Sequence, residues 1–217
     1  MNALGVLMLD TRFPRVQGDI GNPATFPFPV RYRVVRGASP QRVVRERAPA
    51  LLQPFIEAGR ELVAEGATAI TTSCGFLVLF QEALQAALPV PVWTSSLLAL
   101  KVRQAAGKSC GVVTVDAPSL GVDHLRAAGA LPGTPVEGLE AGCDFQRCLL
   151  NDEADFDVEA ARASTVQAAM RIVERRPDLS TIVLECTNMP PYADAVRQAT
   201  GREVCDITTL LMSRFAP

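Results

Sequence analysis

Two kinds of hydrophobic pattern alternate along the chain. Leu4–Leu9 is a short apolar run, and Val30–Val35 alternates Val and Tyr with Arg; both patterns are typical of strands. Residues 48–65 repeat apolar positions at helical spacing, and Gly66 ends that pattern. Further strands are predicted at 68–73, 90–93, 110–115, 135–139, 180–185 and 202–205, and further helices near 76–87, 96–106, 118–128, 155–175, 191–199 and 207–215. This alternation predicts an α/β fold with parallel sheets whose faces are covered by helices.

The two halves of the chain repeat one pattern. GVLMLDT at 5–11 matches GVVTVDA at 111–117, an offset of 106 positions. TAITTSC at 68–74 matches STIVLEC at 180–186, an offset of 112 positions. Matches in the same order at a nearly constant offset predict two equivalent α/β lobes.

Cys74 and Cys186 occupy matching places at the ends of predicted strands. Ligands of parallel α/β sheets bind beyond the carboxyl ends of the strands, where Asp10 and Asp116 also lie. Each cysteine precedes a predicted helix start, and the unpaired N–H groups there are expected to lower a thiol pKa from about 8.5 toward neutrality. We therefore expect one thiolate to remove a proton next to a carboxylate while the opposite thiol donates one.

Residues beside the two cysteines are candidates for substrate binding. Hydroxyl groups and helix-start N–H groups are suited to hold a carboxylate and the enolate formed from it. Asp10 either binds a substrate ammonium, positions a thiol or caps the loop 11–29, and Thr114 either faces the cleft or fills its strand. The expected substrate-binding residues are Asp10, Thr72, Ser73, Gly75, Phe76, Thr114, Thr187 and Asn188. Strand-end cysteines are also common as small hydrophobic residues, so a non-catalytic protein that binds small carboxylates stays open.

The composition argues against several classes of partner and cofactor. The formal net charge is −2, without the basic stripe that nucleic acid or an anionic membrane requires. His124, the sole histidine, is expected on a surface helix, and the spacing of Cys143 and Cys148 in a polar loop does not support a metal site. No phosphate-binding or dinucleotide motif is present, so we expect no metal and no cofactor. Glu185 is expected on the opposite face of its strand from Cys186, in an ion pair with an arginine.

The most apolar stretch, residues 66–100, does not predict a membrane span. Glycines and prolines cut it into pieces shorter than the ~20 residues that a bilayer requires. No basic segment with a cleavage site opens the sequence, and six cysteines without such a signal are expected to be reduced thiols. We therefore expect a cytoplasmic protein.

The chain resembles the aspartate/glutamate racemase superfamily, which includes hydantoin racemases, maleate isomerases and arylmalonate decarboxylases. Cys74 at a strand end, LECTN at 184–188 and the opening GVLMLDT carry the resemblance. It implies two pseudo-symmetric Rossmann-like lobes, each with a mostly parallel four-stranded sheet. The first lobe would comprise residues 1–93 plus 206–217, because the C-terminal helix returns to it, and the second residues 94–205. The resemblance also implies Cys74 and Cys186 as the acid/base pair, and a homodimer or higher homo-oligomer.

Two positions depart from the racemase pattern. Aspartate and glutamate racemases have Cys-Asn-Thr where this chain has Cys74-Gly75-Phe76, and His or Glu where it has Asn188. A neutral amide beside Cys186 favours Cys74 as the base and Cys186 as the proton donor. We expect a cofactor-independent racemase or isomerase of a small carboxylic acid, an amino acid or derivative, with a decarboxylase or lyase as the alternative. The decarboxylases keep only the second cysteine, so Cys74 argues against decarboxylation.

Overall fold

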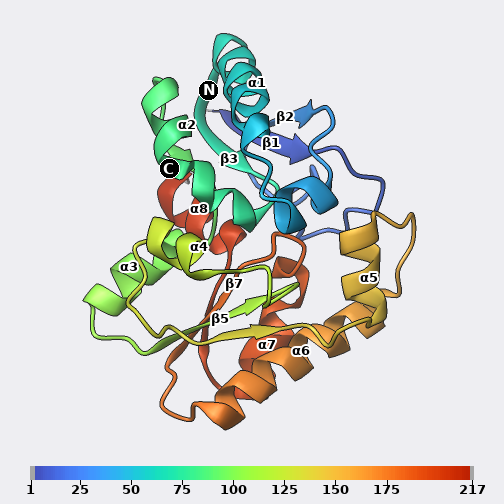
Figure 1. Ribbon diagram of the computed structural model, residues 1–217, viewed down its shortest axis with the longest axis vertical. Coiled ribbons are helices and arrows are strands. Elements are labelled where there is room, and N and C mark those ends of the chain that lie inside the picture. The colour runs from blue at the N-terminus through green and yellow to red at the C-terminus, as the bar shows by residue number, and fades with distance from the viewer. Residues whose placement is uncertain (1–2, 216–217) are drawn as a thin grey trace.

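Two four-stranded sheets form the framework of the computed structural model, which describes residues 3–215 (Figure 1). The first sheet has the strand order β2-β1-β3-β4 and the second has β6-β5-β7-β8. Every strand pair in both sheets is parallel. The predicted α/β fold with two equivalent parallel sheets is therefore confirmed.

The elements follow one another in the expected alternation. The strands are β1 (Ala3–Leu9), β2 (Val30–Val35), β3 (Ala67–Thr72), β4 (Val92–Trp93), β5 (Cys110–Thr114), β6 (Val136–Gly138), β7 (Thr181–Leu184) and β8 (Glu203–Cys205). The α-helices are α1 (Leu52–Ala64), α2 (Gln81–Ala87), α3 (Leu98–Ala105), α4 (Val122–Ala127), α5 (Asp144–Asn151), α6 (Val158–Arg175), α7 (Ala193–Thr200) and α8 (Ile207–Phe215). Shorter helical turns cover Gln41–Arg45, Pro49–Leu51, Gly75–Phe80 and Pro190–Tyr192.

The repeat in the sequence corresponds to equivalent strand registers. Gly5 of β1 lies opposite Ile70 of β3, and Gly111 of β5 lies opposite Ile182 of β7. A Cβ atom at either glycine would overlap a neighbouring side chain, that of Ile70 at Gly5 and that of Ile172 from α6 at Gly111. Both sheets thus need glycine at this place because apolar side chains approach the strand backbone too closely for a side chain there.

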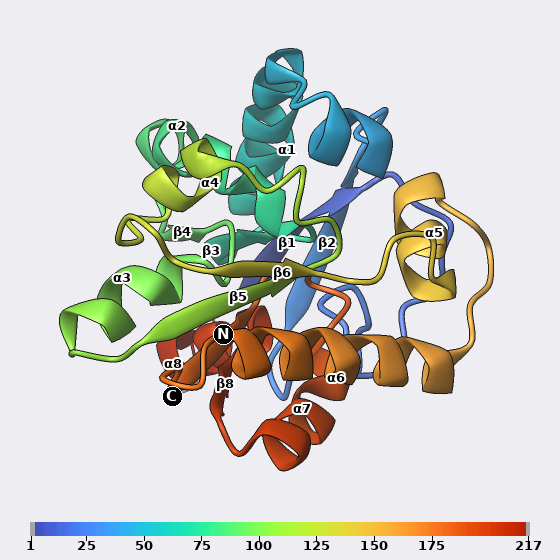
Figure 2. The same ribbon diagram turned by 60° about the horizontal axis from the view of Figure 1, so that its bottom comes forward.

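Helices cover both sheets, and the last helix returns to the first one. α1 packs on β1, β2 and β3, and α6 packs on β5 and β6 (Figure 2). Ile207 and Leu211 of α8 share an apolar cluster with Leu4 and Val6 of β1. A second, larger cluster of buried apolar side chains runs through both sheets and their helices, so the two lobes share one core.

Two helices of the second half rest on turns of the first. α4 contacts the turn at 75–80, and α5 contacts the turn at 41–45. The sequence prediction of a polar loop around Cys143 and Cys148 was wrong, because residues 144–151 form α5. Phe145, Cys148 and Leu149 recur at helical spacing on the buried side of α5. The charged residues on its opposite side made the segment polar enough to be predicted as a loop.

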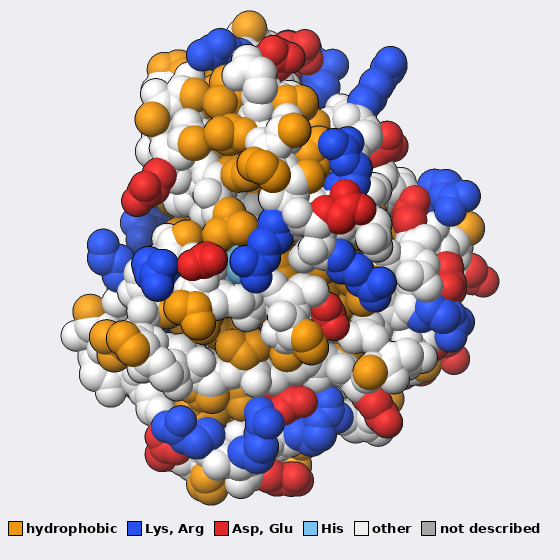
Figure 3. Space-filling model, viewed as in Figure 1, with side chains coloured by type: hydrophobic (Ala, Val, Ile, Leu, Met, Phe, Trp, Pro, Cys, Tyr) orange, Lys and Arg blue, Asp and Glu red, His pale blue; other side chains and the backbone are white. Residues whose placement is uncertain are grey.

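Charges of both signs are interspersed on the surface. Figure 3 shows Lys and Arg side chains beside Asp and Glu on the face it presents, and many of the arginines form ion pairs. Within residues 3–215, no helix combines the length and the apolar character that a bilayer span requires. The expected homo-oligomer, the cytoplasmic location and the lack of a nucleic-acid partner stay predictions.

Candidate active site

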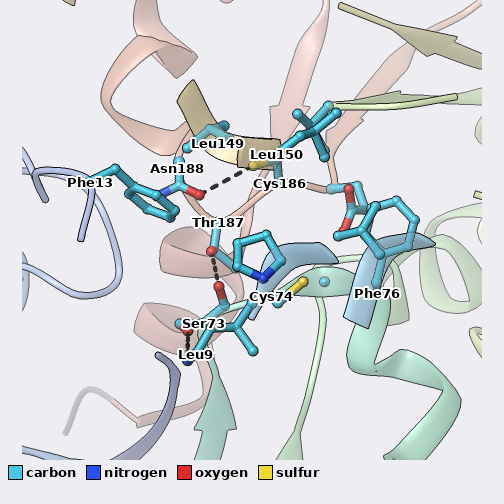
Figure 4. A pocket seen from close by; sticks show the side chains of 15 residues that line it. Leu9, Phe13, Ser73, Cys74, Phe76, Leu149, Leu150, Cys186, Thr187 and Asn188 are labelled. Carbon is cyan, nitrogen blue, oxygen red and sulfur yellow. Dashed lines mark hydrogen bonds between the residues drawn. The ribbon is translucent and has the colours of Figure 1, made fainter. Parts of the chain in front are cut away.

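A cavity at the carboxyl ends of β3 and β7 is lined from both halves of the chain (Figure 4). Cys74 and Cys186, 112 positions apart in the sequence, both line it. The other lining residues are Leu9, Phe13, Pro40, Val44, Ser73, Gly75, Phe76, Val115, Leu149, Leu150, Glu185, Thr187 and Asn188. The free volume is about 30 Å³, room for about one water molecule. The two thiols thus share one small, mostly apolar site.

Three of the expected substrate-binding residues do not line this cavity. Asp10 is exposed and accepts a hydrogen bond from the N–H of Gly37 (3.2 Å), so it caps the loop after β2. The buried Thr72 donates its hydroxyl to the carbonyl of Thr94 (2.7 Å). Thr114 donates to Oε2 of Glu185 (2.6 Å) and therefore acts on the site only through that carboxylate.

The hydroxyl groups that do line the cavity are tied to the backbone. The Thr187 hydroxyl donates to the carbonyl of Ser73 (2.7 Å), and the Ser73 hydroxyl accepts from the N–H of Leu9 (2.8 Å). That the hydroxyls of Thr72 and Thr187 donate to a substrate carboxylate stays a prediction, since in this structure both donate to backbone carbonyls. Their protons satisfy carbonyl groups that the short parallel ladders leave unpaired at the strand ends.

Burial raises the pKa of both thiols. The pKa of Cys74 rises to about 12 through burial and the nearby Glu185, although the N–H groups of Phe76 and Leu77 point at its sulfur and oppose the rise. The pKa of Cys186 lies well above its ordinary value for the same two reasons. The expectation of a thiol pKa near neutrality was wrong because the loss of hydration outweighs the helix-start N–H groups. The raised pKa values favour the protonated form of both thiols.

Cys186 belongs to a hydrogen-bonded chain that ends on a buried carboxylate. Its Sγ donates to Oδ1 of Asn188 (3.5 Å), and Nδ2 of Asn188 donates to Oδ2 of Asp19 (2.5 Å). Asp19 also accepts from Arg15 (3.2 Å) and from the N–H of Gly21 (2.7 Å). Because Asp19 takes the Asn188 amide N–H, the amide oxygen faces the thiol, and Cys186 holds its proton.

Asp19 was not predicted from the sequence. Residues 18–21 read as a flexible glycine-containing loop, but Asp19 is only 2% exposed and Ile20 is fully buried. Burial raises the pKa of Asp19, and Arg15 counteracts the rise. The placement depends on contacts with Asn188, 169 positions later, which no local pattern reveals.

Glu185 lines the cavity, whereas the sequence prediction placed it on the opposite face with an arginine. β7 ends at Leu184, so strand alternation no longer governs residue 185. Oε2 accepts from Thr114, and Oε1 is buried without a hydrogen-bond partner among the described residues. Burial raises the pKa of Glu185 to about 7.

Glu185 also explains the glycine after Cys74. A Cβ atom at Gly75 would overlap Oε1 and the backbone carbonyl of Glu185. The asparagine that racemases carry here would therefore not fit. The carboxylate of Glu185 thus occupies the space that a side chain at position 75 would need.

His124 supports the cavity wall from behind. The prediction of a solvated residue was wrong, since its side chain is fully buried and its ring meets Phe76 edge-on with 5.1 Å between the centroids. Burial lowers the pKa of His124 to about 4, which keeps the ring neutral at physiological pH. Within residues 3–215, no group of three or more His, Cys, Asp and Glu side chains has the arrangement of a metal site.

Sequence comparison identifies relatives of known activity, although no model of a protein family matches the chain. A dimethylsulfoniopropionate lyase of Durusdinium sp. clade D is 32% identical over 94% of this chain and 71% of its own length. The chain belongs to the dimethylsulfoniopropionate lyase family. Dimethylsulfoniopropionate lyase 7 of Emiliania huxleyi is 33% identical over 99% of this chain, which spans 66% of that relative. The chain thus covers about two thirds of the length of these relatives.

Structural comparison places the fold of this chain beside those of a racemase and a decarboxylase. Allantoin racemase from Klebsiella pneumoniae has a TM-score of 0.66 at 14% identity, over 99% of this chain and 89% of the racemase. Unliganded arylmalonate decarboxylase has a TM-score of 0.62 at 18% identity, over 94% and 86% of the two chains. At such low identity the likeness concerns the fold, and it confirms the aspartate/glutamate racemase fold expected from the sequence. The isomerase class is not confirmed, because the sequence relatives are lyases.

Proposed function

We propose that the protein is a lyase that removes the α-proton of a small carboxylate and expels a group from the β-carbon. Dimethylsulfoniopropionate, the compound in the names of the relatives, is the candidate substrate. The observation that carries the proposal is the 32% identity over 94% of the chain to such a lyase. The shared cavity of Cys74 and Cys186 supplies the chemistry.

The proposed reaction is a β-elimination. A thiolate takes the proton from the carbon next to the carboxylate, and the electrons of that C–H bond form a carbon–carbon double bond. The bond between the β-carbon and sulfur breaks, and the sulfur keeps its electron pair. The products are acrylate and dimethyl sulfide. Because the sulfide leaves as a neutral molecule, the departure needs no proton donor.

Cys74 is the proposed base. The N–H groups of Phe76 and Leu77 point at its sulfur and stabilise a negative charge there. Cys186, in contrast, donates its S–H proton in a hydrogen bond to the side-chain oxygen of Asn188. A thiolate formed in this apolar site is strongly basic, which suits the weak acidity of a proton next to a carboxylate. Cys186 then lines the site and donates a hydrogen bond, but the reaction does not require it as a proton donor.

Substrate entry requires the walls to separate. The free volume of about 30 Å³ is smaller than any three-carbon acid. Leu149 and Leu150 on α5 and Val44 in the turn at 41–45 line the cavity, and these two elements contact each other. We infer that α5 moves away from this turn when the substrate binds.

Product formation by the purified protein tests the proposal. Incubation with dimethylsulfoniopropionate should give acrylate and dimethyl sulfide in equal amounts by proton NMR and gas chromatography. Cys74→Ala should lose at least 10²-fold in kcat, in line with the loss of a general base. Cys205→Ala is the matched control, since Cys205 is buried outside this cavity. No product from the wild-type protein would reject the proposal.

Racemisation of a small acid is the second candidate. The two thiols in one cavity and the racemase fold favour it. A racemase would invert a chiral acid in ²H₂O and incorporate deuterium without releasing a leaving group. Polarimetry and proton NMR on the same sample distinguish the two reactions.

A further inference from the structure

Glu185 is the only side chain with a formal charge among the described residues that line the cavity. The remaining lining residues are apolar, or they are cysteine, serine, threonine and asparagine. No lysine, arginine or histidine in residues 3–215 contributes to this wall. The charge of an ionised Glu185 is therefore unbalanced inside the site.

One oxygen of this carboxylate lies beside Gly75, another residue of the cavity wall, and lacks a hydrogen-bond partner among the described residues. Thr114 holds Oε2 at 2.6 Å, which fixes the orientation of the group. Oε1 has no hydrogen-bond partner among the described residues although it is buried. A buried carboxylate oxygen without a partner is unfavourable, and a ligand that complements its charge removes that cost.

We propose that Oε1 of Glu185 is the recognition site for the positively charged end of a zwitterionic substrate. The assignment rests on the proposed function, in which the leaving group is a sulfonium. Phe76 also lines the cavity, and aromatic rings attract weakly hydrated cations; the ring of Phe13, a second lining residue, already carries the guanidinium of Arg15 over one face (4.5 Å). A sulfonium or quaternary ammonium donates no hydrogen bond, so a carboxylate oxygen with aromatic neighbours matches its chemistry.

The same contact connects substrate binding to the base. The charge of Glu185 raises the pKa of both Cys74 and Cys186. A cation beside Oε1 cancels this effect and thereby favours the Cys74 thiolate. Burial, the larger cause of the raised pKa of Cys74, remains, so a cationic substrate promotes ionisation of the base more than a neutral carboxylate of the same shape does.

A pair of ligands with the same shape tests the assignment by binding alone. 3-(Trimethylammonio)propanoate carries a cation where 4,4-dimethylpentanoate carries a neutral carbon. Calorimetry should show that the wild-type protein binds the cationic ligand at least tenfold more tightly. Glu185→Gln should abolish this preference while the affinity for the neutral ligand changes less than threefold.

A second variant controls for disturbance of the site. Thr114→Val keeps the carboxyl group and removes the hydrogen bond that lowers its pKa, so the preference for the cationic ligand should persist once the pH exceeds the further raised pKa of Glu185. An unchanged preference in Glu185→Gln, or no preference in the wild-type protein, would overturn the inference. Because the binding experiment measures no turnover, its result is independent of the lyase assay. If Glu185→Gln loses the preference but the wild-type protein forms no product, only the proposed lyase activity is rejected. If the wild-type protein forms product but Glu185→Gln keeps the preference, only the role of Glu185 is rejected.

Discussion

The hydroxyl of Thr187 in the second lobe donates a hydrogen bond to the carbonyl of Ser73 in the first (2.7 Å). Each of these residues is the chain neighbour of a cavity cysteine, Cys186 and Cys74. The bond therefore joins the two turns that carry the thiols (Figure 4). The spacing of the two sulfurs depends on this direct contact as well as on the packing of the lobes.

Thr187→Val should weaken the junction between the lobes. The substitution keeps the shape but leaves the buried Ser73 carbonyl without its donor, at a cost of about 1–3 kcal/mol. Urea denaturation should show this loss, and Thr187→Ser, which retains the hydroxyl, should unfold close to the wild-type midpoint. Equal midpoints for the Val and wild-type proteins would contradict the role of the bond.

Alkylation of Cys74 should increase steeply with pH. Since the pKa of Cys74 is raised to about 12, its thiolate fraction should grow about tenfold per pH unit between pH 7 and 10. Iodoacetamide labelling followed by peptide mass spectrometry measures the rate. The same peptide in urea should level off above an ordinary thiol pKa near 8.5. A plateau below pH 9 in the folded protein would show that burial does not control this thiol.

Glu185 should make the folded protein less stable as pH rises. Its folded-state pKa of about 7 lies above the ordinary carboxyl value, so the neutral form is favoured on folding. This contribution is complete below about pH 4.5 and is lost as pH rises through 7. The free energy of unfolding of the wild-type protein minus that of Glu185→Gln should fall by about 3 kcal/mol from pH 4 to pH 8. A pH-independent difference would argue against a buried, titrating Glu185.

Asp19 should act on the site through Asn188. Asp19→Ala removes the acceptor of the Asn188 amide and frees that side chain to rotate away from Cys186. We expect a loss of about tenfold or more in kcat, the effect of one hydrogen bond to a charged group, with a smaller change in KM. The infrared S–H stretch of Cys186, assigned by its absence in Cys186→Ser, should shift in the variant. An unshifted band would show that Asn188 keeps its position without Asp19.

The sequence was sufficient for the framework because the relevant patterns are local. Gly5 and Gly111 open the two matching sequence segments, and the offset between the halves placed Cys74 and Cys186 at equivalent strand ends. Both cysteines line one cavity, while their roles in the reaction stay predictions. The parallel direction of the strands in both sheets followed from the alternation of strands and helices along the chain.

The parts that were wrong depend on contacts between distant segments. Glu185 turns into the cavity because β7 has already ended, and His124 is buried because its ring packs against Phe76, 48 positions away in the sequence. The direction of a thiol pKa shift likewise requires knowing how completely the lobes exclude water from Cys74. No spacing rule contains this information.

Product release by the two single-cysteine variants tests the central claim most directly. Circular dichroism first shows that the purified Cys74→Ser and Cys186→Ser proteins are folded. Each variant and the wild-type protein are then incubated with dimethylsulfoniopropionate, and the rates of dimethyl sulfide and acrylate release are compared. If Cys74 is the base of a β-elimination, Cys74→Ser loses at least 10²-fold in kcat and Cys186→Ser loses clearly less. Equal losses in the two variants, or the greater loss in Cys186→Ser, would contradict the account.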